Sequence, residues 1–97
     1  MIDFSQLDKT IHEKGRLSIM TLLSTRPTWA FQELKNELEM SDGNLITHLR
    51  TLQKSDYVAA HKHPSRRETS YSLTEPGRSA FEAYISLLEK IINASKL

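Results

Sequence analysis

The stretch SDGNLITHLRTLQ, residues 41–53, decides the fold. Its large apolar side chains recur at helical spacing and form one stripe, which consists of Leu45, Leu49 and Leu52. Because successive helical residues are rotated by about 100°, Thr47 and Arg50 lie nearly opposite that stripe. One apolar side and one polar side are typical of a recognition helix, which the pattern predicts over residues 42–54.

The residues before this stretch predict a second helix and a tight turn. Phe31, Leu34 and Leu38 stand three and four residues apart, as on one face of a short helix over residues 31–40. In the turn, Ser41 is a suitable N-cap, because its hydroxyl can accept a hydrogen bond from an amide of the first helical turn. Together the two helices predict a helix-turn-helix.

The residues after it predict a small β-hairpin and a long last helix. Strand-forming residues occur at 57–60 and 69–73, on either side of a polar loop. Thr74 can cap a helix whose first turn tolerates Pro76, and apolar residues then recur at helical spacing. We expect this helix over residues 75–97.

The N-terminal part completes the expected fold. Residues 1–24 predict one long helix or a helix that is broken near Gly15, and Thr28 and Trp29 favour a brief strand. The fold class is therefore mainly α with a small β-hairpin (α+β). We expect a winged helix-turn-helix with a long C-terminal helix, in one domain over residues 1–97.

The length and the net charge of the chain limit the functions that it can have. A chain of 97 residues forms one modest core, without room for a separate catalytic or sensor domain. The net charge is only +1, so attraction to a nucleic acid has to come from local clustering. Lys62, Arg66 and Arg67 outnumber Glu68 in residues 61–69, and this segment predicts a basic end of the molecule.

Two kinds of site are excluded by the residues that the chain lacks. It has no cysteine, which excludes disulfides and thiolate metal sites. No stretch approaches the ~18 uninterrupted apolar residues of a membrane-spanning helix, and the first ten residues lack a basic region followed by an apolar block. We expect a soluble, cytoplasmic protein.

Two segments carry a family resemblance: ITHLRTLQKSDYV, residues 46–58, and YSLTEPGRSAFEAY, residues 71–84. With the predicted element order and the basic loop between them, the chain resembles the winged helix-turn-helix regulators of the MarR and ArsR superfamily. It is closely similar to small members that are little more than the DNA-binding domain. The resemblance implies a dimeric transcription factor, but it implies neither a particular operator nor an effector.

In such a fold the recognition helix enters the major groove, and the hairpin loop, here residues 61–69 and called the wing below, contacts the backbone or the minor groove. Asn44 and Thr47 are expected nearest to the bases, since asparagine pairs with adenine and threonine contacts a base or a thymine methyl. The alternative is an ordinary solvated surface. The predicted DNA-contacting residues are Ser41, Asn44, Thr47, Arg50, Thr51, Lys54, Lys62, Arg66 and Arg67.

The last helix carries more apolar surface than a small core readily covers. We therefore expect a homodimer to which residues 1–24 and 75–97 contribute. The alternative is that the stripe folds back onto its own domain, since periodicity shows that a face is buried but not by what. The predicted interface residues are Leu7, Ile11, Tyr84, Ile85, Leu88, Ile91 and Ile92.

The histidines allow more than one role. His48 lies beside the apolar stripe, where a half-buried, hydrogen-bonded imidazole is favoured over a DNA contact or pH sensing. His61 and His63 point to one face of a strand, but two imidazoles without acidic or thiol partners make a weak metal site. We therefore expect no metal and no other cofactor.

The leading functional interpretation is a sequence-specific DNA-binding transcriptional regulator that binds a near-palindromic operator in double-stranded DNA. The alternative is a winged-helix adaptor for protein–protein interaction, because a net charge of +1 does not require DNA binding. An enzyme is not expected, since the chain has no phosphate-binding glycine loop, nucleophile motif or clustered carboxylates. The sequence does not indicate a small-molecule effector.

Overall fold

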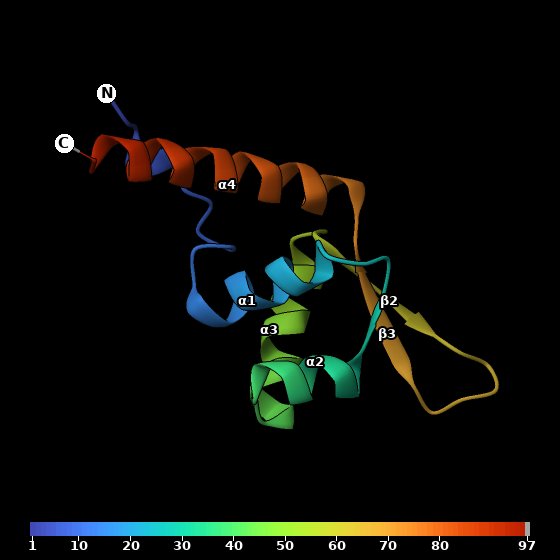
Figure 1. Ribbon diagram of the computed structural model, residues 1–97. Helices are drawn as coiled ribbons and strands as arrows, with labels where there is room; N and C mark the ends of the chain where they lie inside the picture. The colour runs from blue at the N-terminus through green and yellow to red at the C-terminus, as the bar shows by residue number, and fades with distance from the viewer. Residues whose placement is uncertain (97) are drawn as a thin grey trace.

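The computed structural model describes residues 1–96 as a bundle of short helices beside a small antiparallel sheet, crossed at one end by a long helix (Figure 1). This confirms the predicted winged helix-turn-helix; Leu97, the end of the predicted 75–97 helix, lies outside the described residues. The elements in chain order are the 3₁₀ helix η1 (Phe4–Gln6), α1 (Lys14–Leu23), β1 (Trp29–Ala30), α2 (Phe31–Leu38), α3 (Asp42–Lys54), β2 (Val58–Lys62), β3 (Thr69–Leu73) and α4 (Glu75–Ala94).

Side-chain caps explain where α3 and α4 begin. The Ser41 hydroxyl accepts a hydrogen bond from the Asn44 amide at 3.2 Å, so α3 starts at Asp42 as predicted. The Thr74 hydroxyl accepts one from the Gly77 amide at 2.9 Å and starts α4 in the same way. The caps place both helix starts from local sequence alone.

The N-terminal segment is a broken helix. A carboxylate oxygen of Glu13 accepts the Arg16 amide at 2.8 Å and caps α1, which therefore begins at Lys14. In the preceding turn, the Asp8 carboxylate accepts the amides of Thr10 and Ile11. These bonds compete with the helical pattern, so the long-helix alternative is wrong, and the break lies before Gly15 rather than at it.

The core lies between α1, α3 and the sheet. All three leucines of the α3 stripe are at most 1% exposed. Burying one such side chain stabilises the fold by about 1.5–3 kcal/mol. The largest side chains with less than 2% exposure are Ile11, Ile19, Met20, Leu23, Leu34, Leu45, Leu49 and Leu52.

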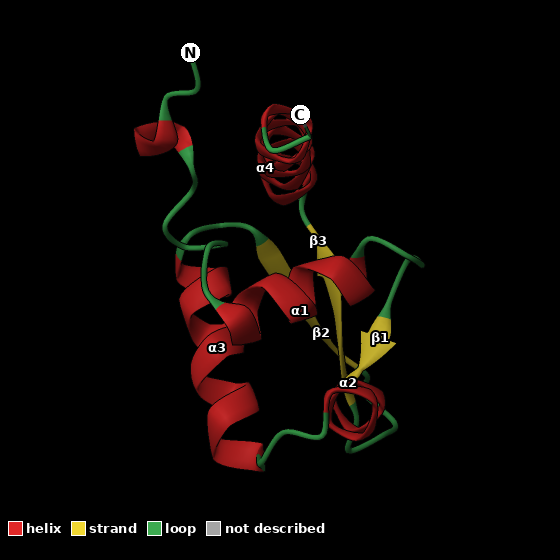
Figure 2. Ribbon diagram, turned by 60° about the vertical axis from the view of Figure 1, so that its left-hand side comes forward, coloured by secondary structure: helices red, strands yellow, loops and turns green. Residues whose placement is uncertain are grey.

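The sheet has the strand order β1-β3-β2. Tyr71 of β3 pairs with Trp29 on one side and with Ala60 on the other. The two ribbon views place α4 at the end of the domain opposite α2, so that α4 does not cover the outer side of α3 (Figures 1 and 2). Among residues 1–96, no helix has both the length and the apolar character needed to cross a membrane.

The chain itself covers only part of the α4 stripe. Phe81, Tyr84 and Leu87 are buried, whereas Ile92 is 52% exposed. The predicted interface residues Leu7, Ile85, Leu88 and Ile91 are partly exposed.

Two residues of the predicted dimer interface are thereby corrected. Ile11 is fully buried and Tyr84 is 3% exposed, both within the core of their own chain. The Tyr84 hydroxyl also lies 2.7 Å from Nδ1 of His12, beside the N-terminal segment. Neither side chain has a surface left for a partner.

Candidate nucleic-acid interface

The outer side of α3 is an exposed polar surface. Asn44, Thr47, Arg50 and Lys54 are exposed along it, and Thr51 is partly exposed. The leucine stripe on the opposite side fixes these residues to the domain. The outer side therefore faces solvent, as the sequence predicted.

The threonines of this surface are already committed as hydrogen-bond donors. The Thr47 hydroxyl donates to the Gly43 carbonyl at 2.8 Å, and the Thr51 hydroxyl donates to the Thr47 carbonyl at 3.1 Å. What they offer to a ligand is a methyl group and the lone pairs of the hydroxyl oxygen. In this conformation Thr47 can accept a hydrogen bond or contact a thymine methyl.

The first turn of α3 is tied to α2. Lys35 Nζ lies 2.9 Å from an Asp42 carboxylate oxygen and joins the two helices of the helix-turn-helix. Ser41 is exposed, but its oxygen is used as the N-cap. Ser41 thus has a structural role that is independent of any contact with DNA.

Arg50 lies toward the sheet. Burial raises the pKa of the Tyr71 hydroxyl, and the positive charge of Arg50 partly offsets this increase. Tyr71 itself is 6% exposed and lines the space between α3 and the wing. Arg50 therefore lies close enough to Tyr71 for its charge to act on the Tyr71 hydroxyl.

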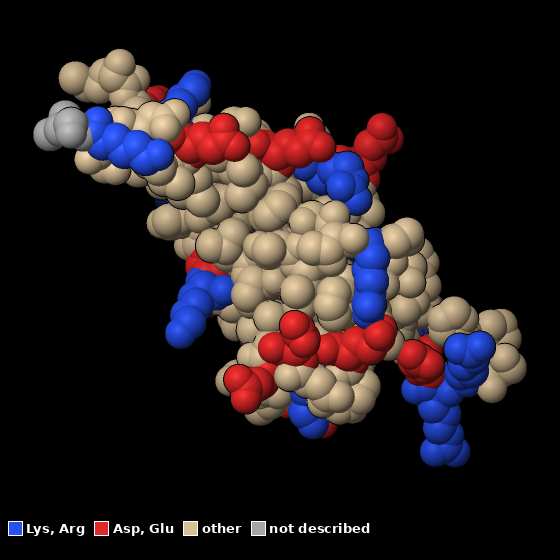
Figure 3. Space-filling view, viewed as in Figure 1, with Lys and Arg blue, Asp and Glu red and all other residues tan. Residues whose placement is uncertain are grey.

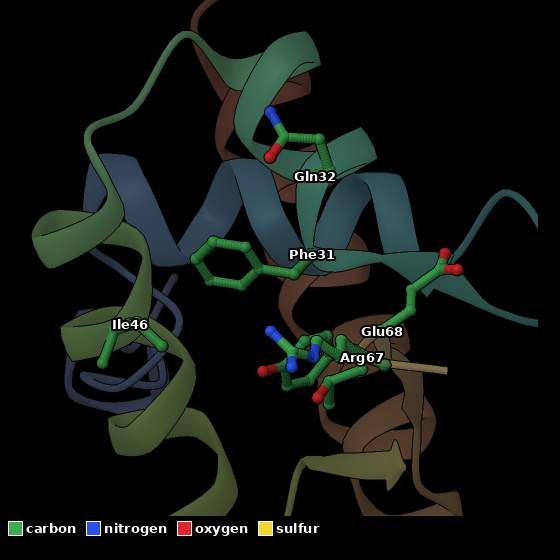
Figure 4. Close-up of a pocket in the computed structure, with 7 residues that line it drawn as sticks. Phe31, Gln32, Ile46, Arg67 and Glu68 are labelled. Carbon is green, nitrogen blue, oxygen red and sulfur yellow. The ribbon is translucent and has the colours of Figure 1, made fainter. Parts of the chain in front are cut away.

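The wing presents its basic residues on two different sides. Lys62 pairs with Thr69, and Ala60 pairs with Tyr71, so alternation along the strands puts Lys62 on the Tyr71 side of the sheet. Arg67 lines a pocket of about 320 Å³ between α2, α3 and the wing, and Figure 4 shows its side chain pointing toward the α3 side. Lys62 and Arg67 therefore share the Tyr71 side of the sheet, which faces α3.

Arg66 lies on the other side of the wing. It lines a separate hollow of about 440 Å³ together with His61 and His63. Its guanidinium is 3.9 Å from a Glu68 carboxylate oxygen. The sequence placed Arg66 and Arg67 in one group, but the structure separates them.

Two apolar residues that face the wing from α2 and α3 were not identified as site residues from the sequence. Ile46 and Phe31 line the same pocket as Arg67 and are both only partly buried (Figure 4). Ile46 lies outside the leucine stripe of α3. An apolar residue at such a position was the sequence signal that could have identified it as part of the pocket. Phe31 was assigned entirely to the core.

Charge is distributed unevenly over the molecule. On the face shown in Figure 3, acidic side chains gather over α2 and along α4, whereas lysine and arginine side chains project from the wing. The acidic residues of α2 include Glu33 and Glu37, and those of α4 include Glu82 and Glu89. The predicted basic end is therefore local and lies at the wing.

The structure shows the surroundings of the histidines, and His48 differs from its prediction in one respect. His48 is half-buried as expected, but its Nδ1 has no hydrogen-bond partner among residues 1–96. His61 Nε2 lies 2.8 Å from the Ser72 hydroxyl. Within the same residues, no group of three histidine or acidic side chains is arranged to hold a metal ion.

Comparisons with known proteins agree with this geometry. The family described as winged helix DNA-binding domain matches residues 16–92. An uncharacterized protein of Methanocaldococcus jannaschii is 36% identical over 79 residues, which are 79% of this chain and 86% of that protein.

Solved structures share the fold. The structure of a transcriptional regulator homologue from Pyrococcus horikoshii OT3 superposes with a TM-score of 0.89 at 25% identity, over 96% of this chain and 95% of that one. The crystal structure of MarR superposes with a TM-score of 0.78 at 16% identity, over 89% of this chain and 64% of that one. These superpositions confirm the winged-helix fold that the resemblance implied.

Proposed function

Because the chain belongs to the winged helix DNA-binding domain family, we propose that it is a transcriptional regulator that recognises a specific DNA sequence. The observation that carries the proposal is the exposed polar side of α3, whose Arg50 lies near Tyr71 of the sheet. Lys62 and Arg67 of the wing lie on that same side. We propose a binding role rather than a catalytic one, because the family is one of DNA-binding domains.

The residues divide into two groups by what they can contact. Asn44, Thr47 and Arg50 face outward from the first turn and the middle of α3, where a helix in the major groove meets base edges. Arg67 and Lys62 supply charge for the backbone or a narrow minor groove. Ser41, Thr51 and Lys54 lie at the borders of this surface, and Arg66 lies on the other side of the wing; all four are assigned to phosphate contacts.

The regulator acts as a homodimer in this proposal. A twofold axis places two copies of α3 in successive major grooves, about 34 Å apart, on a near-palindromic operator. The uncovered apolar residues of α4 and the N-terminal segment supply the contact, because exposed apolar patches of this kind mark protein interfaces. They are Leu7, Ile85, Leu88, Ile91 and Ile92.

The test is a selection of bound sequences from random duplexes, with the mass of the protein–DNA complex measured in parallel. We expect an enriched near-palindrome and two chains for each duplex. An enriched asymmetric motif bound by one chain would contradict the dimer but not the regulator.

Absence of any enrichment would contradict sequence-specific recognition. Failure to be retained on heparin or random duplex at low salt, together with specific capture of a protein, would favour the adaptor alternative. Retention that falls steeply with salt would favour DNA, since phosphate contacts release counterions.

A further inference from the structure

One side chain of α3 lies in a notch on α1 and has no part in the outer surface. The His48 imidazole is 22% exposed, and its Cδ2–Nε2 edge faces Gly15. A Cβ atom on Gly15 would lie 2.6 Å from Nε2 and 2.8 Å from Cδ2, closer than such atoms approach. The ring therefore occupies the space that a side chain at residue 15 would need.

Glu13 borders the notch on a second side. Its Oε1 accepts the Arg16 amide that caps α1 and lies 3.6 Å from Nδ1 of His48. Nδ1 is buried and unpartnered among the described residues. The carboxylate that caps α1 thus lies beside the middle of α3, at a distance longer than a hydrogen bond.

The other charged groups near the notch come from α1 and α2. Arg16 Nη1 lies 3.8 Å from the same Glu13 oxygen, and Lys14 and Glu37 line an adjoining cavity of about 390 Å³. This cavity borders both Gly15 and His48.

The leucine stripe sets which side of α3 faces the core, and the contact of His48 with Gly15 adds a second constraint on the rotation of the helix. Burial of Leu45, Leu49 and Leu52 is driven by a non-directional effect, whereas the His48 ring fits a space that exists only because residue 15 is a glycine. His48 follows Thr47 directly, so rotation of the helix at one residue also moves the other.

We propose that His48 is a positioning residue that, packed against Gly15, sets the rotation of α3 and thereby the direction of Asn44 and Thr47. The consequence for DNA rests on the proposed function. The contact itself is a property of the free protein, and the two can be tested separately.

The experiment compares Gly15→Ala, His48→Ala and the double variant in the full chain. The matched control is Thr21→Ala, at an exposed position of the same helix α1. Amide hydrogen exchange of α3 in the free protein measures the contact without DNA. The ratio of affinities for the selected operator and a random duplex measures the positioning.

We expect each single variant to raise exchange in α3 about tenfold relative to α4, and to lower the affinity ratio about tenfold. The double variant should be no worse than His48→Ala, because both changes remove the same contact. Thr21→Ala should change neither quantity. Gly15→Ala keeps the test decisive if His48→Ala does not fold.

An unchanged affinity ratio in both single variants, with a wild type that prefers its operator, would overturn the positioning role. Equal effects of Thr21→Ala and Gly15→Ala would overturn it as well. Raised exchange in a protein whose wild type has no operator preference would support the contact and overturn the proposed function alone.

Discussion

Helices α3 and α4 are both amphipathic and both start at a hydroxyl cap, but the chain covers their apolar sides to different extents. The stripe of α3 is completely buried by α1, α2 and the sheet. The stripe of α4 is buried at Phe81 and Tyr84, but it is exposed at Ile92. What α3 presents to solvent is therefore polar, and what α4 presents is in part apolar.

The difference indicates two kinds of partner. A polar side with arginine, asparagine and threonine suits a hydrated, charged ligand such as duplex DNA. An apolar remainder suits another protein surface, and a second copy supplies one by symmetry. The molecule is elongated, 54 × 26 × 21 Å, and α4 crosses one end, away from the outer side of α3 (Figure 1).

The largest effect should be a difference in the free energy of unfolding between a buried residue of α3 and an exposed residue of α4. Leu49→Ala should lower the free energy of unfolding by about 2–5 kcal/mol, because it leaves a cavity in the core. Ile92→Ala should lower it by less than about 0.5 kcal/mol at protein concentrations where the chain is monomeric. Urea denaturation measures both values, and equal losses would contradict the assignment of Ile92 to the surface.

The second prediction concerns the uncovered part of α4. Ile92→Glu should weaken self-association by about 1–3 kcal/mol, because it places an unpaired charge in the proposed contact. Sedimentation equilibrium gives the association constant, and circular dichroism checks that the variant is folded. A wild type that is monomeric at all concentrations would contradict the proposed homodimer.

Arg66 and Arg67 provide a matched pair on the DNA side. Arg67→Ala should weaken binding to every duplex by about 1 kcal/mol more than Arg66→Ala, since Arg67 lies on the α3 side of the wing. The slope of affinity against salt should fall more for the Arg67 variant. Filter binding at several salt concentrations measures both, and equal effects would show that the two sides of the wing do not differ functionally.

The smallest effect is expected where the residues after α3 contact the N-terminal segment. The Tyr57 hydroxyl donates to the Asp8 carboxylate, and this bond raises the pKa of Tyr57 to about 12. The protonated phenol is therefore favoured in the folded state. Its stabilisation should be complete below the ordinary value near 10 and be lost as the pH rises through about 12.

Tyr57→Phe removes this bond and keeps the ring. We expect it to lower the free energy of unfolding by about 1 kcal/mol at pH 7. The gap between wild type and variant should close above pH 10. A gap that is constant up to the highest pH at which both proteins fold would contradict the bond.

The sequence predicted what depends on neighbours along the chain. The start of α3 follows from Ser41, and the burial of Leu45 follows from spacing. The break before α1 was left open, because it depends on Asp8 and Glu13 bonding to the backbone instead of lying on a helix surface.

What depends on partners far along the chain was not predictable. Periodicity assigned Tyr84 to a buried side, but only the fold shows that its own chain buries it. The separation of Arg66 from Arg67 follows from the geometry of the hairpin loop, and two adjacent arginines carry no signal for it. The notch around His48 required α1 and α3 to be placed together.

The most direct test is a nuclear magnetic resonance titration of the ¹⁵N-labelled chain with a selected duplex of ~20 base pairs, long enough for two half-sites. We expect the largest changes in amide chemical shift in α3, from Gly43 to Thr51, and in the wing, with smaller changes in α1. Shifts confined to α4, or no shifts at a concentration where the duplex is retained, would contradict recognition by the outer side of α3.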